Sequence, residues 1–376
     1  MIPIFSNSLG HEEAVAVEKV LKSKWVGACD KTLEFEKKFG ERLNSKHTLS
    51  FNCATAALYG SMKILDIKPG DEVLIPSINF IGCANAIIDA GAKPIFCDVD
   101  LNTFNVLPSE IEKKLTKKTK ALLMLHYGGR PANFDEIKEV CGDIKIIEDS
   151  CNTVFSKYKD RYCGTLGDIG CFSFDSMKIL VTGDGGMMTF QNDEYLEKAL
   201  QYRYLGLPSK TKSGVDSLND GNSNWWEIEL GSTSGRFVSN DIISSIGLVQ
   251  LGKVDGFLKR RQMIWDIYKS ELGDVDWLIL PPEPEENCTS SHFLFWLRIK
   301  DNLRDRFARY MTDNGVYVTF RYHPLHKIKL YKEFYLPLKN ADEISKSAIN
   351  IPIHQNLTDD NLDYIIDKIR NFKEVI

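Results

Sequence analysis

Five residues with reactive or ligand-binding side chains stand directly after apolar runs of the sequence. They are Thr55, Phe80, Asp149, Ser173 and Lys178. The apolar runs have the length of strands, and ligands of an open parallel sheet gather at the carboxyl ends of its strands. We therefore expect these five side chains to share one site at an edge of a sheet.

A carboxylate and a lysine are the reactive members of this set. A buried Asp149 is costly unless a positive charge pairs with it, and the protonated ring nitrogen of pyridoxal 5'-phosphate (PLP) is such a charge. An aspartate at that position keeps the ring an electron sink. Lys178, held in a dry pocket beside cationic groups, would lose its proton readily and form an imine with the cofactor aldehyde. This pair of residue types is consistent with a PLP site.

The other residues of the set suit the phosphate and the ring of that cofactor. Thr55 and Ala56 stand at the predicted start of a helix, where free N–H groups and the helix dipole favour an anion. Ser173 would add a second hydroxyl from a neighbouring strand end. Phe80 offers a flat face on which a ring can stack. The sequence thus supplies a partner for each part of PLP.

Each of these residues also has an explanation without a ligand. Asp149 can cap the next turn, and Thr55 can be an ordinary helix N-cap. Phe80 can belong to the core, and Lys178 is one of 47 basic residues, most of which should lie on the surface. Composition and periodicity alone leave these alternatives open.

Alternation of short apolar runs with helical patterns predicts the elements that position these residues. The runs are continuously apolar, which is typical of strands covered on both faces. Expected strands are 73–76, 94–97, 121–126, 144–148, 170–174 and 186–190, and expected helices are 55–65, 80–90, 108–115 and 133–140. The pattern predicts an α/β domain with a mostly parallel central sheet flanked by helices.

The second half of the chain predicts a long helix and a smaller α+β domain. Residues 208–224 are polar and rich in turn formers, which indicates a long loop. A helix is expected over 240–272, with Asn240 or Asp241 as its cap. Beyond it, strands are expected at 292–299 and 316–320 and helices at 301–314 and 359–372. We place the large domain at 1–245 and the smaller C-terminal domain at 246–376.

The composition of the chain indicates which kinds of partner and which cellular compartment to expect. Apolar residues make up 43%, charged residues 26%, and the net charge is −5, so we expect no nucleic-acid partner. We interpret the lysine-rich stretch 113–120 as a solvated helix end and not as a nucleic-acid patch. The apolar runs fall short of the roughly 18 residues of a membrane span, and the N-terminus lacks the pattern of a signal peptide. Nine scattered cysteines without a C-x-x-C pair predict no metal site and a cytoplasmic location.

Motifs spread over nearly the whole chain resemble the DegT/DnrJ-type sugar aminotransferases, PLP enzymes of the aspartate-aminotransferase fold (fold type I). The motifs occur in the order of that family, and the segment around Lys178 is the most specific. They are Ser23-Lys-Trp-Val-Gly, Phe35-Glu-Lys-Lys-Phe, Cys53-Ala-Thr-Ala-Ala-Leu, Asp71-Glu-Val-Leu-Ile-Pro-Ser with Phe80, His126-Tyr-Gly-Gly, Glu148-Asp-Ser, Gly167-Asp, Phe172-Ser-Phe-x-x-x-Lys-x-x-x-x-Gly-Asp-Gly-Gly, Arg321-Tyr-His-Pro-Leu-His and Ile351-Pro-Ile-His-Gln-Asn-Leu-Thr-Asp.

The resemblance implies a role for each matching residue. Lys178 would be the imine lysine and general base, and Asp149 the partner of the pyridine nitrogen. Thr55, Ala56 and Ser173 would hold the phosphate, and Phe80 would stack on the ring.

Two further positions differ from the pattern of the family. Asn152 stands where the family usually has Gln or His against the ring hydroxyl, and its side chain is one methylene shorter than Gln. Where relatives supply a phosphate-binding Asn from the neighbouring subunit, this chain has none. Arg236 is the nearest anion-binding candidate, with a surface arginine as the alternative.

Substrate contacts are expected from a histidine-rich segment near the C-terminus. In the family this segment lies by the sugar and nucleotide, so Arg321, His323 and His326 are candidate substrate residues. The pair His323 and His326 has the H-x-x-H spacing, but Pro324 between them argues against a helical metal site.

The resemblance implies an aminotransferase that converts a keto-sugar to an amino-sugar. The sugar would be carried on a nucleotide, with its ketone at C3 or C4, and glutamate would donate the amino group. A cyclitol ketone is a variation that the sequence leaves open. Alternatives are a PLP-dependent sugar dehydratase, in which the family replaces the lysine by histidine, and a PLP-binding regulator without activity. A homodimer is expected, because sites in this family borrow residues across the two-fold axis.

Overall fold

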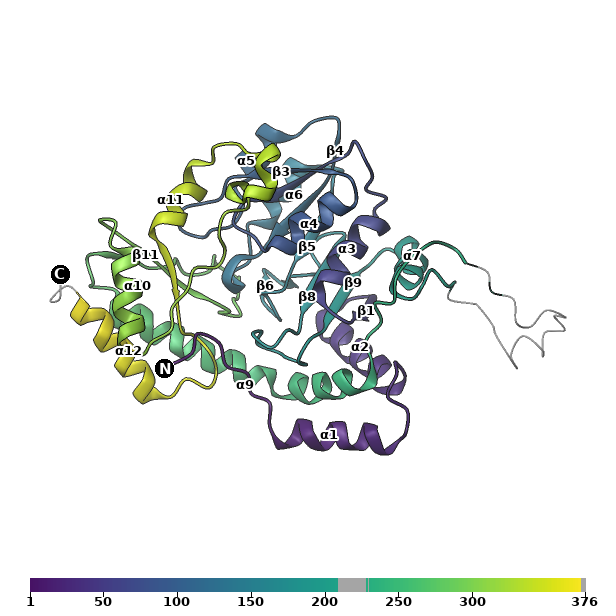
Figure 1. The fold of residues 1–376 in the computed structure, drawn as a ribbon, viewed down its shortest axis with the longest axis horizontal. Coiled ribbons are helices and arrows are strands. Elements are labelled where there is room, and N and C mark those ends of the chain that lie inside the picture. Colours follow the sequence, from purple (N-terminus) through teal and green to yellow (C-terminus); the bar gives the residue numbers. More distant parts are fainter. Residues whose placement is uncertain (209–227, 229, 373–376) are drawn as a thin grey trace.

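A seven-stranded, mostly parallel sheet forms the centre of the computed structural model, which describes residues 1–208, 228 and 230–372 (Figure 1). The strand order is β1-β9-β8-β5-β4-β2-β3. The strands are β1 (His47–Phe51), β2 (Glu72–Pro76), β3 (Lys93–Cys97), β4 (Thr119–Leu125), β5 (Lys145–Asp149), β8 (Ile169–Ser173) and β9 (Gly186–Phe190). Only β9 runs against the other strands of this sheet, pairing antiparallel with β8 and β1.

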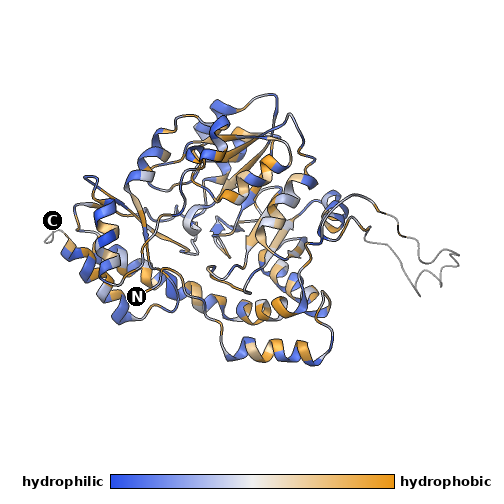
Figure 2. Cartoon of the chain, viewed as in Figure 1, coloured by the Kyte–Doolittle hydropathy of each residue, from blue (hydrophilic) through white to orange (hydrophobic). Residues whose placement is uncertain are grey.

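Both faces of the sheet are buried, as the continuous apolar runs predicted. Alternate residues of one strand enter two different cores: Leu122 packs on one side of the sheet and Leu123 on the other. Helices α5 (Pro108–Lys114) and α6 (Phe134–Cys141) cover the first side. The other side is covered by α2 (Asp30–Leu43), α3 (Ala54–Ile64) and α4 (Ile81–Asp89). Figure 2 shows the apolar strands enclosed by helices with polar outer surfaces.

A long helix, α9 (Asp241–Leu272), runs along one edge of the molecule (Figure 1). Helix α1 (His11–Lys22) and α2 pack against it, and so does α12 (Asp359–Asn371) from the C-terminal part. The C-terminal part contains a three-stranded antiparallel sheet of β10 (Leu278–Ile279), β11 (Phe295–Ile299) and β12 (Ala348–Ile351), with helices α10 (Arg304–Asp313) and α11 (Lys339–Ser347). The expected boundary at 245/246 falls inside α9, and the division into two domains stays a prediction.

The expected elements agree with the structure where a sequence pattern was strong. The six strands and four helices expected before residue 190 are present, each within about two residues of the expected bounds. The helix expected over 240–272 is α9, and Asn240 caps it by accepting a hydrogen bond from Ile243 N at 3.1 Å.

Other expectations were incomplete or wrong. The strand expected at 316–320 is wrong: this segment makes only single bridges, from Val316 to Ile2 and from Thr319 to Asn350. Strand β1 and helices α1, α2 and α7 (Glu194–Arg203) were not expected. The loop expected at 208–224 lies, apart from its first residue, outside the described residues.

None of the described helices has the length and apolar character needed to cross a membrane.

Asp241, at the start of α9, ties that helix to the start of α2. Its carboxylate accepts hydrogen bonds from the backbone N–H groups of Cys29 and Thr32 at 2.8 and 3.0 Å and from Thr32 Oγ1 at 2.7 Å. Lys31 N lies 3.2 Å from its second oxygen. The carboxylate thus satisfies N–H groups that the beginning of α2 leaves without intrahelical partners.

We predict that Asp241→Ala lowers the free energy of unfolding by about 1–3 kcal/mol at neutral pH, because buried donors lose their acceptor. Burial alone would raise the pKa of the Asp241 carboxyl, but the hydrogen bonds from Thr32, Cys29 and Lys31 outweigh it and lower the pKa. A lowered pKa in the folded state stabilises the protein above the unfolded pKa, about 4, and this stabilisation is lost as pH falls through the folded pKa.

Urea unfolding at several pH values between 7 and 3 tests this prediction. The difference between wild type and Asp241→Ala should be largest above about pH 4 and shrink below it. Asp266→Ala, at an exposed position of the same helix, is the matched control and should change stability by no more than about 0.5 kcal/mol. An equal loss at every pH would contradict the role given to the ionised carboxylate.

Candidate active site

A cavity of about 280 Å³ lies at the carboxyl ends of the central strands and brings most of the expected residues together. Six of them lie in its walls: Thr55, Phe80, Asp149, Ser173, Lys178 and Arg321. Parallel strands deliver these side chains to one edge because their carboxyl ends meet there. The cavity is therefore the candidate active site.

The start of α3 faces this cavity with its backbone donors free. Cys53 is the N-cap residue and its side chain makes no capping hydrogen bond. Thr55, the second residue of the helix, lines the cavity, and Ala56, the third, is buried behind it. Gly186 lets β9 approach this helix end, since a Cβ there would come within 2.5 Å of Ala54 N. Uncapped N–H groups at a helix start suit a phosphate.

Asp149 ends β5 with a carboxylate that is only 2% exposed. The thiol of Cys83 on α4 donates to Oδ2 at 3.2 Å, and Cys151 N donates to Oδ1 at 3.1 Å. Among the residues that the structure describes, no lysine, arginine or histidine forms an ion pair with this carboxylate. A buried carboxylate held by two neutral donors favours a cation in the cavity.

Lys178 follows β8 and is enclosed at the bottom of the cavity, with Nζ 4.8 Å from the centroid of the Phe293 ring. Burial alone would lower its pKa, as expected from the sequence. The nearby acidic groups outweigh burial and raise the pKa, and they belong to Tyr322, Cys151, Asp149 and Asp175. The proton loss expected for Lys178 beside cationic groups stays a prediction.

Phe80 and Ser173 both line the cavity. The Phe80 ring is 41% exposed and packs over Gly82, where a Cβ would come within 2.8 Å of it. Tyr322 meets it at 6.2 Å between ring centroids, in an edge-on arrangement that leaves a Phe80 face available. Ser173 Oγ accepts a hydrogen bond from Asp175 N at 3.3 Å and retains its own proton for a ligand.

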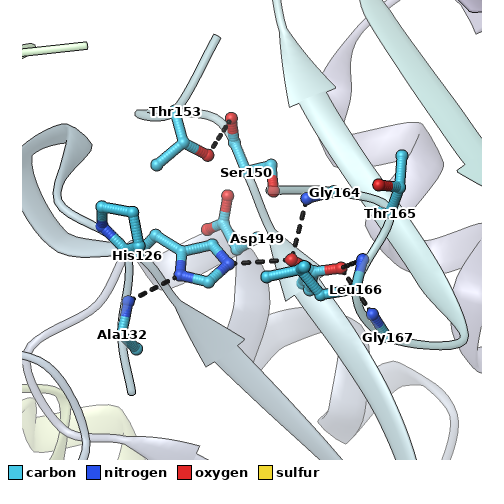
Figure 3. A network of polar contacts seen from close by, with 12 residues as sticks. His126, Ala132, Asp149, Ser150, Thr153, Gly164, Thr165, Leu166 and Gly167 are labelled. Atoms are coloured by element: carbon cyan, nitrogen blue, oxygen red, sulfur yellow. Dashed lines mark hydrogen bonds and ion pairs between the residues drawn. The ribbon is translucent and has the colours of Figure 1, made fainter. Parts of the chain in front are cut away.

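A buried network fixes the strand that carries Asp149 (Figure 3). Glu148, the preceding residue, points to the other face of the sheet, and its Oε2 lies 2.8 Å from His126 Nε2. Since His126 Nδ1 accepts from Ala132 N at 3.0 Å, its Nε2 carries the proton and donates to Glu148. The remaining donors to this carboxylate, at 2.8, 2.7 and 2.7 Å, are the backbone N–H groups of Gly164, Leu166 and Gly167.

The structure places Asn152 next to the cavity and not in its wall. The side chain is 2% exposed, and neither its amide oxygen nor its amide nitrogen has a hydrogen-bond partner. A buried amide without partners is costly. The two unpartnered amide atoms favour a polar ligand group nearby, and contact with the ring hydroxyl stays a prediction.

Besides Ala56 and Asn152, three further expected residues do not line the cavity. Arg236 is exposed, with its guanidinium 5.4 Å from the Tyr204 ring, and does not reach the cavity of its own chain. His323 is exposed outside the wall. His326 is 1% exposed and packs in the core, where Nδ1 lies 2.6 Å from Ser77 Oγ and Nε2 lies 3.4 Å from Asp342. A substrate role for His326 is not supported, because no face of its ring reaches the cavity.

Sequence reasoning gave no role to several residues that the structure brings to the site. The thiol of Cys83 donates to Asp149, a contact that nothing in the sequence indicated. Tyr322, Asp175 and Asp184 line the cavity. Their motifs were recognised, but the contacts depend on segments far apart in the chain. Asp175 and Asp184 flank Lys178 in sequence, and that spacing was the available signal.

The residues present fit PLP. Among the described residues Asp149 forms no ion pair, the start of α3 is uncapped, Phe80 offers a ring face and Lys178 offers an amine, all at one cavity. Within the described parts of the chain, no cluster of three or more His, Cys, Asp or Glu residues could hold a metal ion.

Comparisons with known proteins agree with this arrangement. Residues 7–370 match the sequence profile of the DegT/DnrJ/EryC1/StrS aminotransferase family. A dTDP-4-dehydro-2,3,6-trideoxy-D-glucose 4-aminotransferase from Saccharopolyspora spinosa is 37% identical, over 100% of this chain and 97% of the relative.

Two solved structures are similar along the whole chain. The aminotransferase TlmJ from Streptoalloteichus hindustanus has a TM-score of 0.93 and 40% identity, covering 100% of this chain and 99% of its own. Spr1654 from Streptococcus pneumoniae in its PMP form has a TM-score of 0.91 and 26% identity, covering 100% of both chains.

We predict that PLP becomes covalently attached to Lys178 when the loaded, yellow protein is reduced with borohydride, because this amine lines the cavity. Peptide mass spectrometry should find the reduced adduct on Lys178 in wild type and none in Lys178→Ala. Lys37→Ala, at an exposed position of α2, is the matched control and should label as wild type. Full labelling of Lys178→Ala would show that another lysine is the attachment site.

Proposed function

The chain belongs to the DegT/DnrJ/EryC1/StrS aminotransferase family, and we propose that it transfers an amino group from glutamate to the ketone of a nucleotide-linked sugar. Membership confirms the resemblance, the fold class, the aminotransferase class and PLP as cofactor that were expected from the sequence. Because the Saccharopolyspora spinosa relative is named a 4-aminotransferase, we propose C4 as the carbon that receives the amino group.

The observation that carries this proposal is the presence of Lys178 and Asp149 in one enclosed cavity. PLP, when bound, supplies an electrophilic aldehyde and a ring that accepts electrons. The start of α3 and Ser173 would hold its phosphate, and Phe80 would cover its ring. Asp149 would hold the proton on the ring nitrogen, since its buried carboxylate is most stable beside a positive charge.

Lys178 has two tasks in this proposal. Its Nζ would hold the cofactor through the aldehyde, and, when free of that bond, would accept a proton from the substrate carbon and return it. With Asp149 neutralised by the ring nitrogen, one of the groups that raise the pKa of Lys178 no longer acts on it. The amine can then accept and return a proton near neutral pH.

Neither alternative function is favoured by the site. The resemblance associates the dehydratases with a histidine at the position of Lys178. A regulator that binds PLP without turnover would have no need of both Lys178 and Asp149 in the cavity. An assay decides between the enzyme and the regulator.

The test is a product assay with ¹⁵N-labelled glutamate and a panel of nucleotide-linked 3- and 4-keto-sugars and cyclitol ketones. We expect ¹⁵N in an amino-sugar from a 4-keto substrate, detected by mass spectrometry, and at least about 1000-fold less product with Lys178→Ala. Labelled product from a 3-keto-sugar or a cyclitol alone would move the proposal to that substrate. Wild type that loads PLP and aminates no member of the panel would favour the regulator.

We also propose that the protein is a cytoplasmic homodimer. All nine cysteines are free, which suits a reducing compartment. Two apolar side chains of the cavity wall, Phe80 and Met177, are exposed. A second copy that covers these side chains would bury them and close the cavity.

In this dimer, Arg236 would reach the phosphate of the neighbouring subunit. Mixing two inactive variants, Lys178→Ala and Arg236→Ala, tests this placement by subunit exchange. If Arg236 acts across the interface, one site of each mixed dimer regains both residues, and about a quarter of all sites become active after random exchange. No recovery in a confirmed dimer would remove Arg236 from the neighbour's site, and an active monomer would contradict the dimer.

A further inference from the structure

Cys83 lies behind the carboxylate of Asp149 and outside the wall of the cavity. It is the third residue of α4 and is 0% exposed. Its Sγ lies 3.2 Å from Oδ2 of Asp149. Because Asp149 lines the cavity and Cys83 does not, a ligand of the cavity can be affected by this thiol only through the carboxylate.

The thiol is the donor of this hydrogen bond. An ionised carboxylate accepts hydrogen bonds and has no proton to donate. Burial raises the pKa of the Cys83 thiol well above its usual range, and the negative charge of Asp149 raises this pKa further. Cys83 therefore keeps its proton near neutral pH and presents it to Oδ2.

One helical turn supports both this thiol and the ring of Phe80. Phe80 is the N-cap residue of α4, and Cys83 N donates a hydrogen bond to Phe80 O at 3.1 Å. Phe80 N in turn donates to Asn79 Oδ1 at 2.7 Å. The ring that would cover the cofactor and the donor behind Asp149 are thus held by the same short stretch of backbone.

The hydrogen bond from Cys83 changes how strongly Asp149 attracts a proton. An ionised carboxylate has about four acceptor positions on its two oxygens. Cys151 N takes one of them on Oδ1, at 3.1 Å, and the Cys83 thiol takes one on Oδ2. A hydrogen bond to the charged form of a carboxylate favours that form. The carboxylate with this donor is therefore a weaker base than the carboxylate without it.

This difference matters when Asp149 meets the ring nitrogen of PLP. A proton shared by the two can lie on the nitrogen or on the carboxylate. On the nitrogen it makes the ring a strong electron sink, whereas on the carboxylate it leaves the ring neutral. A donor behind Asp149 shifts this balance toward the protonated ring.

We propose that Cys83 is a positioning residue that keeps the shared proton on the ring nitrogen of PLP and off Asp149. The inference rests on the pairing of Asp149 with the ring nitrogen, as given in the proposed function. Cys83 would act through Asp149 without touching cofactor or substrate. The alternative is a small residue that only fills space in the core, and it would need no donor at this place.

Nuclear magnetic resonance of protein loaded with PLP that carries ¹⁵N in its ring reports where this proton lies. We expect the signal of a protonated nitrogen in wild type at neutral pH. In Cys83→Ala the ratio of unprotonated to protonated nitrogen should rise about 3- to 10-fold, because a hydrogen bond to a charged group is lost. Cys83→Ser keeps a donor and should stay within about twofold of wild type.

Cys97→Ala is the matched control for this comparison. Cys97 ends β3, is also 0% exposed, and lies outside the wall of the cavity. The substitution removes the same atoms from the core as Cys83→Ala and should leave the ¹⁵N signal unchanged. If Cys83→Ala fails to load PLP, Cys83→Val fills the same space without a donor and supplies the same comparison.

Steady-state kinetics of amination gives a second readout. A ring that holds its proton less often is a weaker electron sink, so kcat of Cys83→Ala should fall about 3- to 10-fold. The KM for glutamate should stay within about twofold, since Cys83 does not line the cavity. Cys83→Ser should have a kcat within about twofold of wild type.

Three results would overturn the proposal. The first is a ¹⁵N signal in Cys83→Ala that equals that of wild type. The second is an equal displacement in Cys83→Ala and Cys83→Ser, because the effect would then not depend on a donor. The third is an equal displacement in Cys97→Ala, which would assign the effect to loosened packing of the core.

The outcomes for Cys83 and for the proposed function are distinguishable. An unprotonated ring nitrogen in wild type would contradict the pairing with Asp149 and, with it, the role of Cys83. If wild type holds a protonated ring nitrogen and aminates no keto-sugar, the proposed function fails, and the ¹⁵N comparison still decides the role of Cys83.

Discussion

The buried carboxylate of Asp149 is the constraint on which the rest of the site depends. It is 2% exposed, and the thiol of Cys83 and the N–H of Cys151 donate to it. A buried charge with two neutral donors is stable only if a cation completes its surroundings. The sheet delivers this carboxylate to the same cavity as Lys178 and the start of α3, so that one cofactor meets all three.

The position of that carboxylate is set from the opposite face of the sheet. Glu148 is buried beside it in sequence and receives donors from His126 and from the 164–167 turn (Figure 3). Because neighbouring residues of a strand point to opposite faces, fixing Glu148 also fixes the direction of Asp149. The direction of the Asp149 side chain is thus set by hydrogen bonds on the face of the sheet opposite the cavity.

The sequence predicted the central sheet and most of the site because each strand run was apolar and each motif local. Strand β1 was missed because its five residues mix polar and apolar side chains. Helix α2 was missed although Phe35, Phe39 and Leu43 give it a buried stripe at helical spacing. The segment 316–320 was wrongly expected as a strand because its apolar residues pack without a full partner strand. The core position of His326 and the thiol contact of Cys83 depend on segments distant in the chain. Such contacts leave no pattern in the local sequence.

The most direct test of the central claim compares the binding of PLP with that of an analogue whose ring nitrogen is replaced by carbon. The analogue keeps the aldehyde and the phosphate and removes only the cation that Asp149 is inferred to need. We predict that wild type binds PLP at least about tenfold more tightly than the analogue, and that Asp149→Ala loses this preference. Equal affinity of wild type for the two compounds would contradict the pairing of Asp149 with the ring nitrogen.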